Sequence, residues 1–170
     1  MRRRSTLAGF ALVAAVVALA TVGGVAGAKS GSQPNPAVEI GTAKVPQLGT
    51  VLVNGHGQVL YMFAPDDRSK VACNAACQKV WLPDVAPKKG VAKAIGAARQ
   101  SLIGSGRNPA DGRRIVTYDG WPLYKYVLDT RPREATGQNV ALNGGFWWVL
   151  TPAGKVNQTP VSHGGYDEGS

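Results

Sequence analysis

Cysteine and histidine are scarce in this 170-residue chain, which has only two of each. A structural zinc site needs four Cys or His ligands, and no such set occurs at ligand spacing around the cysteines. His56 lies in a glycine-flanked turn and His163 lies near the C-terminus. No G-x-S-x-G signature accompanies them. The sequence therefore predicts no metal site, no cofactor and no catalytic residues, and we do not expect an enzyme.

Acidic residues are also few, since ten Asp and Glu stand against nineteen Lys and Arg, for a net charge of +9. The bases are scattered singly or in pairs such as Lys88-Lys89 and Arg113-Arg114. A nucleic-acid-binding stripe needs clustered bases with aromatic residues available for stacking, so no nucleic-acid partner is expected. Attraction to anionic envelope polymers, or contact with an envelope protein, fits the positive balance better.

Only one long uncharged run is present, from Leu7 to Ala28, and three arginines precede it. The basic start, the apolar stretch and the small residues Ala26-Gly27-Ala28 are typical of a secretory signal peptide. We predict that residues 1–28 are removed, which leaves an exported chain of the cell envelope or extracellular space without a membrane span. A retained anchor is the alternative, because the run approaches the ~20 residues that span a bilayer.

The rest of the chain contains an internal repeat with an offset of 63 residues. Residues 39–66 align without gaps on residues 102–129, with nine identities in 28 positions. In each copy a β-branched run precedes an Asn-Gly or Asp-Gly turn and a second strand-like run, the signature of a hairpin. The expected hairpin strands are 49–53 with 58–63 and 114–118 with 121–126. Shorter strands are expected over 38–44 and 101–107, and a late strand over 146–151.

These elements predict a mainly β fold in which two duplicated, hairpin-containing units pack as one small sandwich or barrel-like domain. The domain is expected over residues 37–161, with repeats at about 38–98 and 101–158. One short helix is expected near residues 72–81. Residues 29–36 are expected to form a flexible lead-in, and residues 162–170 a disordered tail.

Both copies contain the pattern Y-x-[FWY]-x-x-D, as Tyr61-Met62-Phe63-Ala64-Pro65-Asp66 and Tyr124-Lys125-Tyr126-Val127-Leu128-Asp129. With it come a Cys pair leading into Trp81-Leu82-Pro83 and a Gly145-Phe146-Trp147-Trp148 strand. The chain resembles the bacterial predicted-lipoprotein family with this motif, also described as a secreted repeat of unknown function. The resemblance implies export and a duplicated unit, but no reaction. Many members carry a lipidated cysteine, which is missing here.

Each candidate residue has a structural and a functional interpretation. The motif residues Tyr61, Phe63, Asp66, Tyr124, Tyr126 and Asp129 could form either a structural corner or a Tyr/Asp ligand surface. We favour the corner, in which the aspartates cap the strand exits, because one geometry serves both copies. Arg68 and Arg131, each two residues further on, could pair with these aspartates. The tryptophans Trp81, Trp121, Trp147 and Trp148 are either core residues or exposed platforms for a sugar or protein partner.

The cysteines Cys73 and Cys77 favour a structural disulfide in an oxidising compartment. We therefore expect a non-catalytic exported module with a structural or binding role. One alternative is an extracytoplasmic redox or metal-handling protein that uses the cysteine pair. Carbohydrate binding through exposed tryptophan is a further alternative.

Overall fold

Each copy of the repeat begins with an antiparallel hairpin. The computed structural model describes residues 38–68 and 70–161. In the first copy β1 (Glu39–Val45) pairs with β2 (Gly49–Asn54), and in the second copy β6 (Ile103–Arg107) pairs with β7 (Arg114–Tyr118). These are the strands that alternating β-branched runs beside Gly-containing turns predict, to within two residues.

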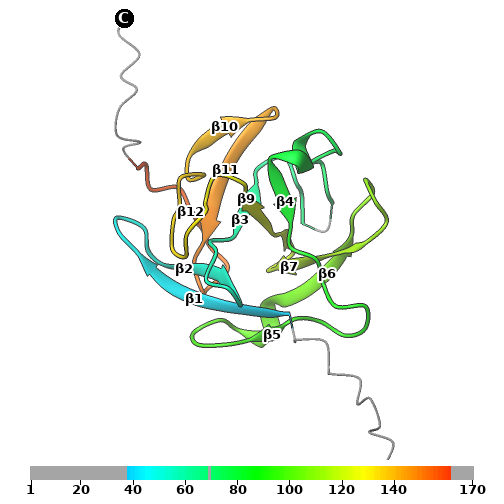
Figure 1. Cartoon of the computed structure of the whole chain (residues 1–170). Helices are drawn as coiled ribbons and strands as arrows, with labels where there is room; N and C mark the ends of the chain where they lie inside the picture. Colours follow the sequence, from blue (N-terminus) through cyan, green and yellow to red (C-terminus); the bar gives the residue numbers. More distant parts are fainter. Residues whose placement is uncertain (1–37, 69, 162–170) are drawn as a thin grey trace, which may run out of the picture. The chain divides into compact units, whose positions relative to one another are not determined.

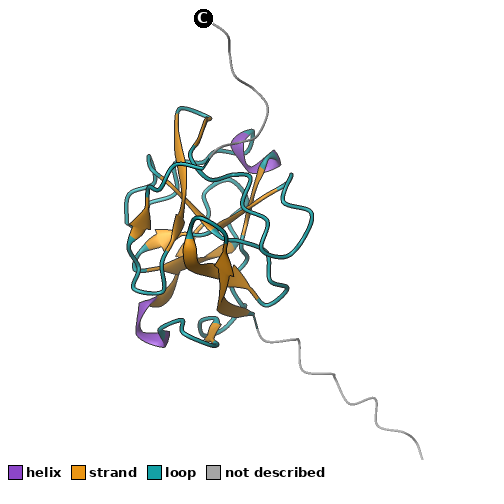
Figure 2. Cartoon of the chain, turned by 90° about the vertical axis from the view of Figure 1, so that its left-hand side faces the viewer, coloured by secondary structure: helices purple, strands orange, loops and turns teal. Residues whose placement is uncertain are grey.

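The remaining elements are short, and Figure 2 shows how strands and loops dominate the described part of the chain. They are β3 (Tyr61–Phe63), the 3₁₀ turn η1 (Cys77–Lys79), β4 (Trp81–Pro83), β5 (Lys93–Ala94), the 3₁₀ turn η2 (Gln100–Leu102), β8 (Trp121–Pro122), β9 (Tyr124–Tyr126), β10 (Val140–Leu142), β11 (Gly145–Leu150) and β12 (Val156–Asn157). Strand β5 extends the first hairpin beside β1, and β8 extends the second beside β7. The predicted mainly β class is confirmed.

A six-stranded sheet joins the two copies, in the order β10-β11-β3-β9-β4 with β12 on β11. Strands β3 and β4 belong to the first copy, whereas β9 and β11 belong to the second. The copies therefore alternate across the middle of the sheet, and Figure 1 shows these four strands side by side. The three central pairings, β11 with β3, β3 with β9 and β9 with β4, each join one copy to the other. The two copies are therefore interlaced in this sheet.

The strand registers reveal an approximate two-fold relation between the copies. Tyr61 of β3 lies opposite its repeat equivalent, Tyr124 of β9. Phe63 lies opposite Trp147, and Tyr126, the equivalent of Phe63, lies opposite Trp81. Trp81 and Trp147 therefore occupy equivalent positions, although 66 residues separate them instead of 63.

The hairpin predicted over 49–53 and 58–63 is shorter than expected. After the turn only Val59 bridges Val53, and the chain then leaves β2 to form β3 in the central sheet. The second copy does the same, because β8 pairs with β7 while β9 departs. Pairing with the other copy takes these strand ends away from their own hairpins.

The helix predicted near residues 72–81 was wrong. Only the turn η1 is helical there, and β4 begins at Trp81. At the start of the segment, the N–H groups of Ala72 and Cys73 donate hydrogen bonds to the Asp66 carboxylate. At its end, Trp81 pairs with β9 in the central sheet. Too few residues remain between these contacts for a helix. The predicted signal peptide (1–28), lead-in (29–36) and tail (162–170) lie outside the described residues.

Candidate functional site

The motif tyrosines form hydrogen bonds across the boundary between the two copies. The hydroxyl of Tyr61 in β3 donates to Oδ2 of Asp129 at 2.5 Å, and the hydroxyl of Tyr124 in β9 donates to Oδ2 of Asp66 at 2.6 Å. Each motif therefore contributes its tyrosine to the aspartate of the other motif. Four of the six predicted motif residues are thus brought together as a reciprocal pair, which we call the Tyr–Asp lock.

The second oxygen of each aspartate binds the loop that follows its own strand. Oδ1 of Asp66 accepts the N–H groups of Ala72 at 2.5 Å and Cys73 at 3.2 Å. Oδ1 of Asp129 accepts the N–H group of Thr136 at 2.9 Å and its hydroxyl at 2.6 Å. Each aspartate thus joins the other copy's strand to its own loop.

Electrostatics keep the tyrosines of the lock in the neutral, donating form. Burial and the neighbouring carboxylate together raise the pKa of Tyr61 and of Tyr124 far above the ordinary value. Burial also raises the pKa of Asp66 and of Asp129, and hydrogen bonds from the tyrosines and loops oppose this rise. All four residues are at most 3% exposed. A group so enclosed serves packing and hydrogen bonding better than contact with a ligand.

The expected ion pairs of these aspartates do not form. Arg68 binds Asp119 at 3.0 Å, and Arg131 binds Glu134 at 2.8 Å. The prediction was wrong because both motif aspartates are buried and already accept hydrogen bonds, whereas the arginine side chains stay at the surface.

The remaining motif residues belong to a stack of four aromatic rings. Trp81 and Trp147 stack at 3.9 Å between ring centroids, Phe63 lies at 4.2 Å from Trp147, and Tyr126 lies at 4.3 Å from Trp81. The stack follows the two-fold relation of the strands. The two indoles are completely buried, so they are core residues.

Trp121 and Trp148 are only partly buried. Trp148 stacks at 5.5 Å on Phe146, which is 47% exposed. Among the predicted tryptophans, Trp148 therefore forms a partly exposed aromatic pair with Phe146 while it also packs against the core. Its partner Phe146 is not among the candidate residues that the sequence indicates.

The two cysteines are bonded to each other, with Cα atoms 5.4 Å apart. Cys73 and Cys77 are 1% and 2% exposed, so solvent reaches neither sulfur freely. The equivalent loop of the second copy has Thr136 and Val140 at these positions. The disulfide is therefore an addition to the first copy and not part of the shared unit.

The structure places a cleft of about 410 Å³ next to the turn that follows β2. Its wall includes Glu39, His56, Asp84 and Lys125. Asp84 is 6% exposed, and its Oδ2 atom has no hydrogen-bond partner among the described residues. Burial raises the pKa of Asp84 to about 6, although Lys125 and His56 act in the opposite direction. We call this the Asp84 cleft.

Sequence reasoning missed Asp84 because its equivalent is not at the 63-residue offset. Since Trp81 corresponds to Trp147, Asp84 corresponds to the buried Leu150. Lys125 corresponds in turn to the buried Met62. An alignment of Trp81 with Trp147, at an offset of 66 residues, places the acidic Asp84 opposite the apolar Leu150. That contrast is the sequence signal that could have identified Asp84. The glycine-flanked turn around His56 likewise gives no sequence signal of a cleft.

Among residues 38–68 and 70–161, no group of three or more His, Cys, Asp or Glu side chains is close enough to hold a metal ion. No helix in this described part is long and apolar enough to cross a membrane. Comparison with curated proteins found no match, and comparison with solved structures found none either.

A comparison with protein families gave one match. Residues 42–83 and 107–151 each match the family described as a secreted repeat of unknown function. The first segment extends from within β1 to the end of β4, and the second from the last residue of β6 to the residue after β11, so each match includes the second strand of a hairpin, a motif and a Trp strand. Because the two matches together cover just over half of the chain, it belongs to this family of secreted repeats and contains two copies of the unit.

Proposed function

We propose that the chain is an exported, non-catalytic module of the cell envelope that binds anionic envelope polymers through its surface charge. The observation that carries the proposal is which charges are buried. The described residues include fifteen Lys and Arg, all at least partly exposed, and eight Asp and Glu. Three of those acids, Asp66, Asp84 and Asp129, are buried. The surface is therefore more basic than the composition suggests.

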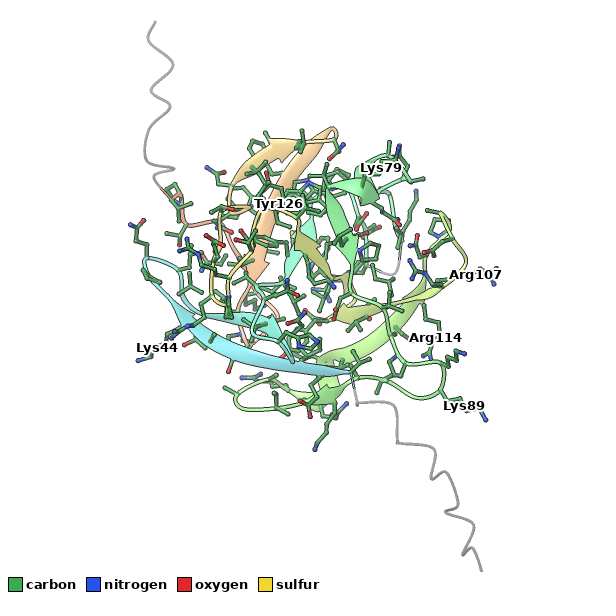
Figure 3. All side chains as sticks on the ribbon, in the orientation of Figure 1. Lys44, Lys79, Lys89, Arg107, Arg114 and Tyr126 are labelled. Carbon is green, nitrogen blue, oxygen red and sulfur yellow. A yellow bond between two sulfur atoms is a disulfide. The ribbon has the colours of Figure 1, made fainter. Side chains whose placement is uncertain are left out.

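The excess is greatest on what we call the basic side, made up of Lys79, Lys88, Lys89, Arg107, Arg113 and Arg114. The labelled members lie along one side in Figure 3, with Lys44 on the other. Between residues 79 and 114 the one exposed acid is Asp111, which pairs with Arg113 at 2.6 Å. A field of one sign attracts polyanions and weakens with salt.

The test is binding of the exported chain to polyphosphate, as a probe for phosphate-rich envelope polymers, with neutral dextran as the reference. Replacing Lys88 and Lys89 by Glu should weaken binding to polyphosphate at low salt several-fold. The matched control replaces Lys44 and Lys155 by Glu, which gives the same net charge away from the basic side. Equal loss in both variants, or equal binding of dextran, would contradict the proposal.

The redox alternative is less well supported. A catalytic dithiol needs an accessible sulfur, and both sulfurs here belong to buried residues. The measurement is thiol labelling in mild reductant: a structural bridge should become reactive only when the chain unfolds. A pair that cycles in the folded protein would favour the redox role.

Carbohydrate binding is a second candidate because the exposed Phe146 stacks on the partly exposed Trp148. Such a pair can pack against the apolar face of a sugar ring. Envelope glycan fragments should then change the tryptophan fluorescence of the exported chain, and Trp148→Ala should abolish the change. A response that persists in the variant would place the sugar elsewhere.

A further inference from the structure

We propose that the Asp84 cleft binds a small zwitterion, a molecule with one ammonium and one carboxylate group, such as a free amino acid or a short peptide. None of the six residues of the basic side lines this cleft, although Lys125 also lines a neighbouring pocket with Lys79 and Arg113, and the inference does not depend on polymer binding. Its volume of about 410 Å³ falls within the ~300–1,000 Å³ of ordinary small-molecule sites.

The first argument is the unsatisfied carboxylate. A buried charge without a hydrogen bond is costly, and native proteins rarely keep one without a use. Neither Lys125 nor His56 forms an ion pair with Asp84 within the described part of the chain, although both influence it. The Asp84 main chain is fixed, since its N–H group donates to Leu123 and its carbonyl accepts from Val116. The Asp84 side chain is therefore held at the wall of the cleft, with its Oδ2 atom buried and unpaired.

The second argument is the comparison that the duplication provides. The approximate two-fold relation places Leu150 at the position equivalent to Asp84 and Met62 at the position equivalent to Lys125. Both Leu150 and Met62 are buried in an apolar cluster. The fold thus tolerates an apolar pair at this place, and the charged pair has no evident structural necessity.

The other half also has a cleft, lined by Ser101, Leu102, Thr117 and Asp119. Asp119 is the repeat equivalent of His56, and it is already paired with Arg68 by two contacts at 3.0 and 3.2 Å. The second cleft therefore supplies a cation to its own carboxylate. In the Asp84 cleft no ion pair with Asp84 forms among the described residues, so a ligand ammonium group can take that place.

The third argument is the chemistry of the walls. Two acids, Asp84 and Glu39, can accept an ammonium group, and charge-assisted hydrogen bonds are the strong ones. Two basic side chains, Lys125 and His56, can meet a carboxylate. Within residues 38–68 and 70–161 no Trp, Tyr or Phe lines the cleft, so this part of the chain offers a sugar no ring to stack on. A zwitterion uses both kinds of charge, whereas a simple amine or acid uses one.

The experiment titrates the folded exported chain with L-alanyl-L-alanine, and in parallel with ethylamine and with propionate, by isothermal calorimetry and by NMR of the His56 ring. The dipeptide should bind at least about tenfold more tightly than either single-charge probe, which corresponds to ~1.4 kcal/mol. Equal affinities for the three probes, or no heat and no His56 shift with the dipeptide, would overturn the assignment.

The variants Asp84→Leu and Lys125→Met install the residues of the equivalent positions, so loss of folding is not expected. Each should weaken dipeptide binding about tenfold or more. Polyphosphate binding is compared in Asp84→Leu, where it should not weaken, because Lys125 also lines a pocket with Lys79 and Arg113 of the basic side. The control Asp119→Asn breaks the ion pair of the other cleft and should leave dipeptide binding intact. Unchanged affinity in Asp84→Leu would refute the proposed site.

Acid offers an independent check on the same site. The groups facing Asp84 are Lys125 on β9, His56 in the turn after β2 and Glu39 on β1. Protonation of Asp84 removes the charge that the ligand ammonium needs, so affinity should fall between pH 7.5 and pH 5. Affinity that is constant over this interval would contradict the role of Asp84.

Discussion

Deleting one hydroxyl from the Tyr–Asp lock should destabilise the whole domain. The changes are Tyr61→Phe and Tyr124→Phe, which keep the ring and its packing and remove only the donor. The lock joins strands of different copies, so its loss should weaken the central sheet as a unit.

The structure allows the two costs to be ranked. A hydrogen bond to a charged group contributes about 1.5–3 kcal/mol, and an unsatisfied buried acceptor adds to the loss. Tyr124→Phe removes the single bond to Asp66, for which we expect about 2 kcal/mol. Tyr61→Phe also removes an acceptor for the N–H group of Gly137 at 3.3 Å, for which we expect about 3 kcal/mol. For a domain of this size the midpoint of thermal unfolding should fall by roughly 10 °C in Tyr61→Phe.

Urea unfolding followed by far-ultraviolet circular dichroism measures the free energy of unfolding directly. Tyr126→Phe is the matched control, because it deletes a phenol hydroxyl of the same motif that makes no hydrogen bond among the described residues, and it should cost under about 0.5 kcal/mol. If Tyr61→Phe and Tyr124→Phe cost no more than this control, the lock does not stabilise the fold.

Three further predictions concern stability. Burial raises the pKa of Asp84 to about 6, so the folded chain binds this proton more tightly than the unfolded chain. The free energy of unfolding should therefore rise as the pH falls from 7 to 5. Asp84→Leu should remove this pH dependence and should raise the free energy of unfolding by about 3 kcal/mol at neutral pH. A lower stability of the variant would contradict the prediction. Replacing Cys73 and Cys77 by Ala should cost about 2 kcal/mol in the same urea assay, because the closed loop is short; a neutral double variant would mean that the bridge does not stabilise the fold. Gly137→Ala should cost about 1–3 kcal/mol, since its Cβ would meet the Trp81 ring at 2.8 Å, whereas Gly55→Ala, with no atom closer than 3.5 Å, should be tolerated; equal costs would contradict the packing argument.

Much of the fold was predictable because its determinants are local. Strands β1, β2, β6 and β7 follow from β-branched runs beside turn residues, and the repeat offset identified their equivalence. Their pairing was not predicted, because the expected hairpins joined 49–53 to 58–63 and 114–118 to 121–126, whereas β2 pairs along its length with β1 and β7 with β6. The interlacing of the central sheet was not predictable in the same way. Whether β3 pairs with its own copy or with the other depends on contacts 60 or more residues apart, and the repeat makes both partners chemically alike.

The motif shows the same division between local and distant information. Its structural role was favoured from the sequence, and the buried Tyr–Asp lock is consistent with that preference. The identity of the partners was not predictable, since Tyr61 and Asp66 lie in one hexapeptide yet bind residues of the other copy. The helix expected over residues 72–81 failed for a related reason. Composition favoured it, but a distant strand and a nearby carboxylate offered the backbone better hydrogen bonds.

Duplication also separates what the fold needs from what one copy has acquired. Whatever both copies share, the Tyr–Asp lock and the aromatic stack, maintains the interlaced sheet, and its loss should always appear as lost stability. Whatever one copy alone has, including Asp84 and the disulfide, stands at positions that the other copy fills with ordinary residues such as Leu150. An unpaired buried carboxylate at such a position lowers stability in the free protein, and no structural requirement explains its presence. A binding role is therefore sought more reasonably in the asymmetric residues than in the motif that defines the family.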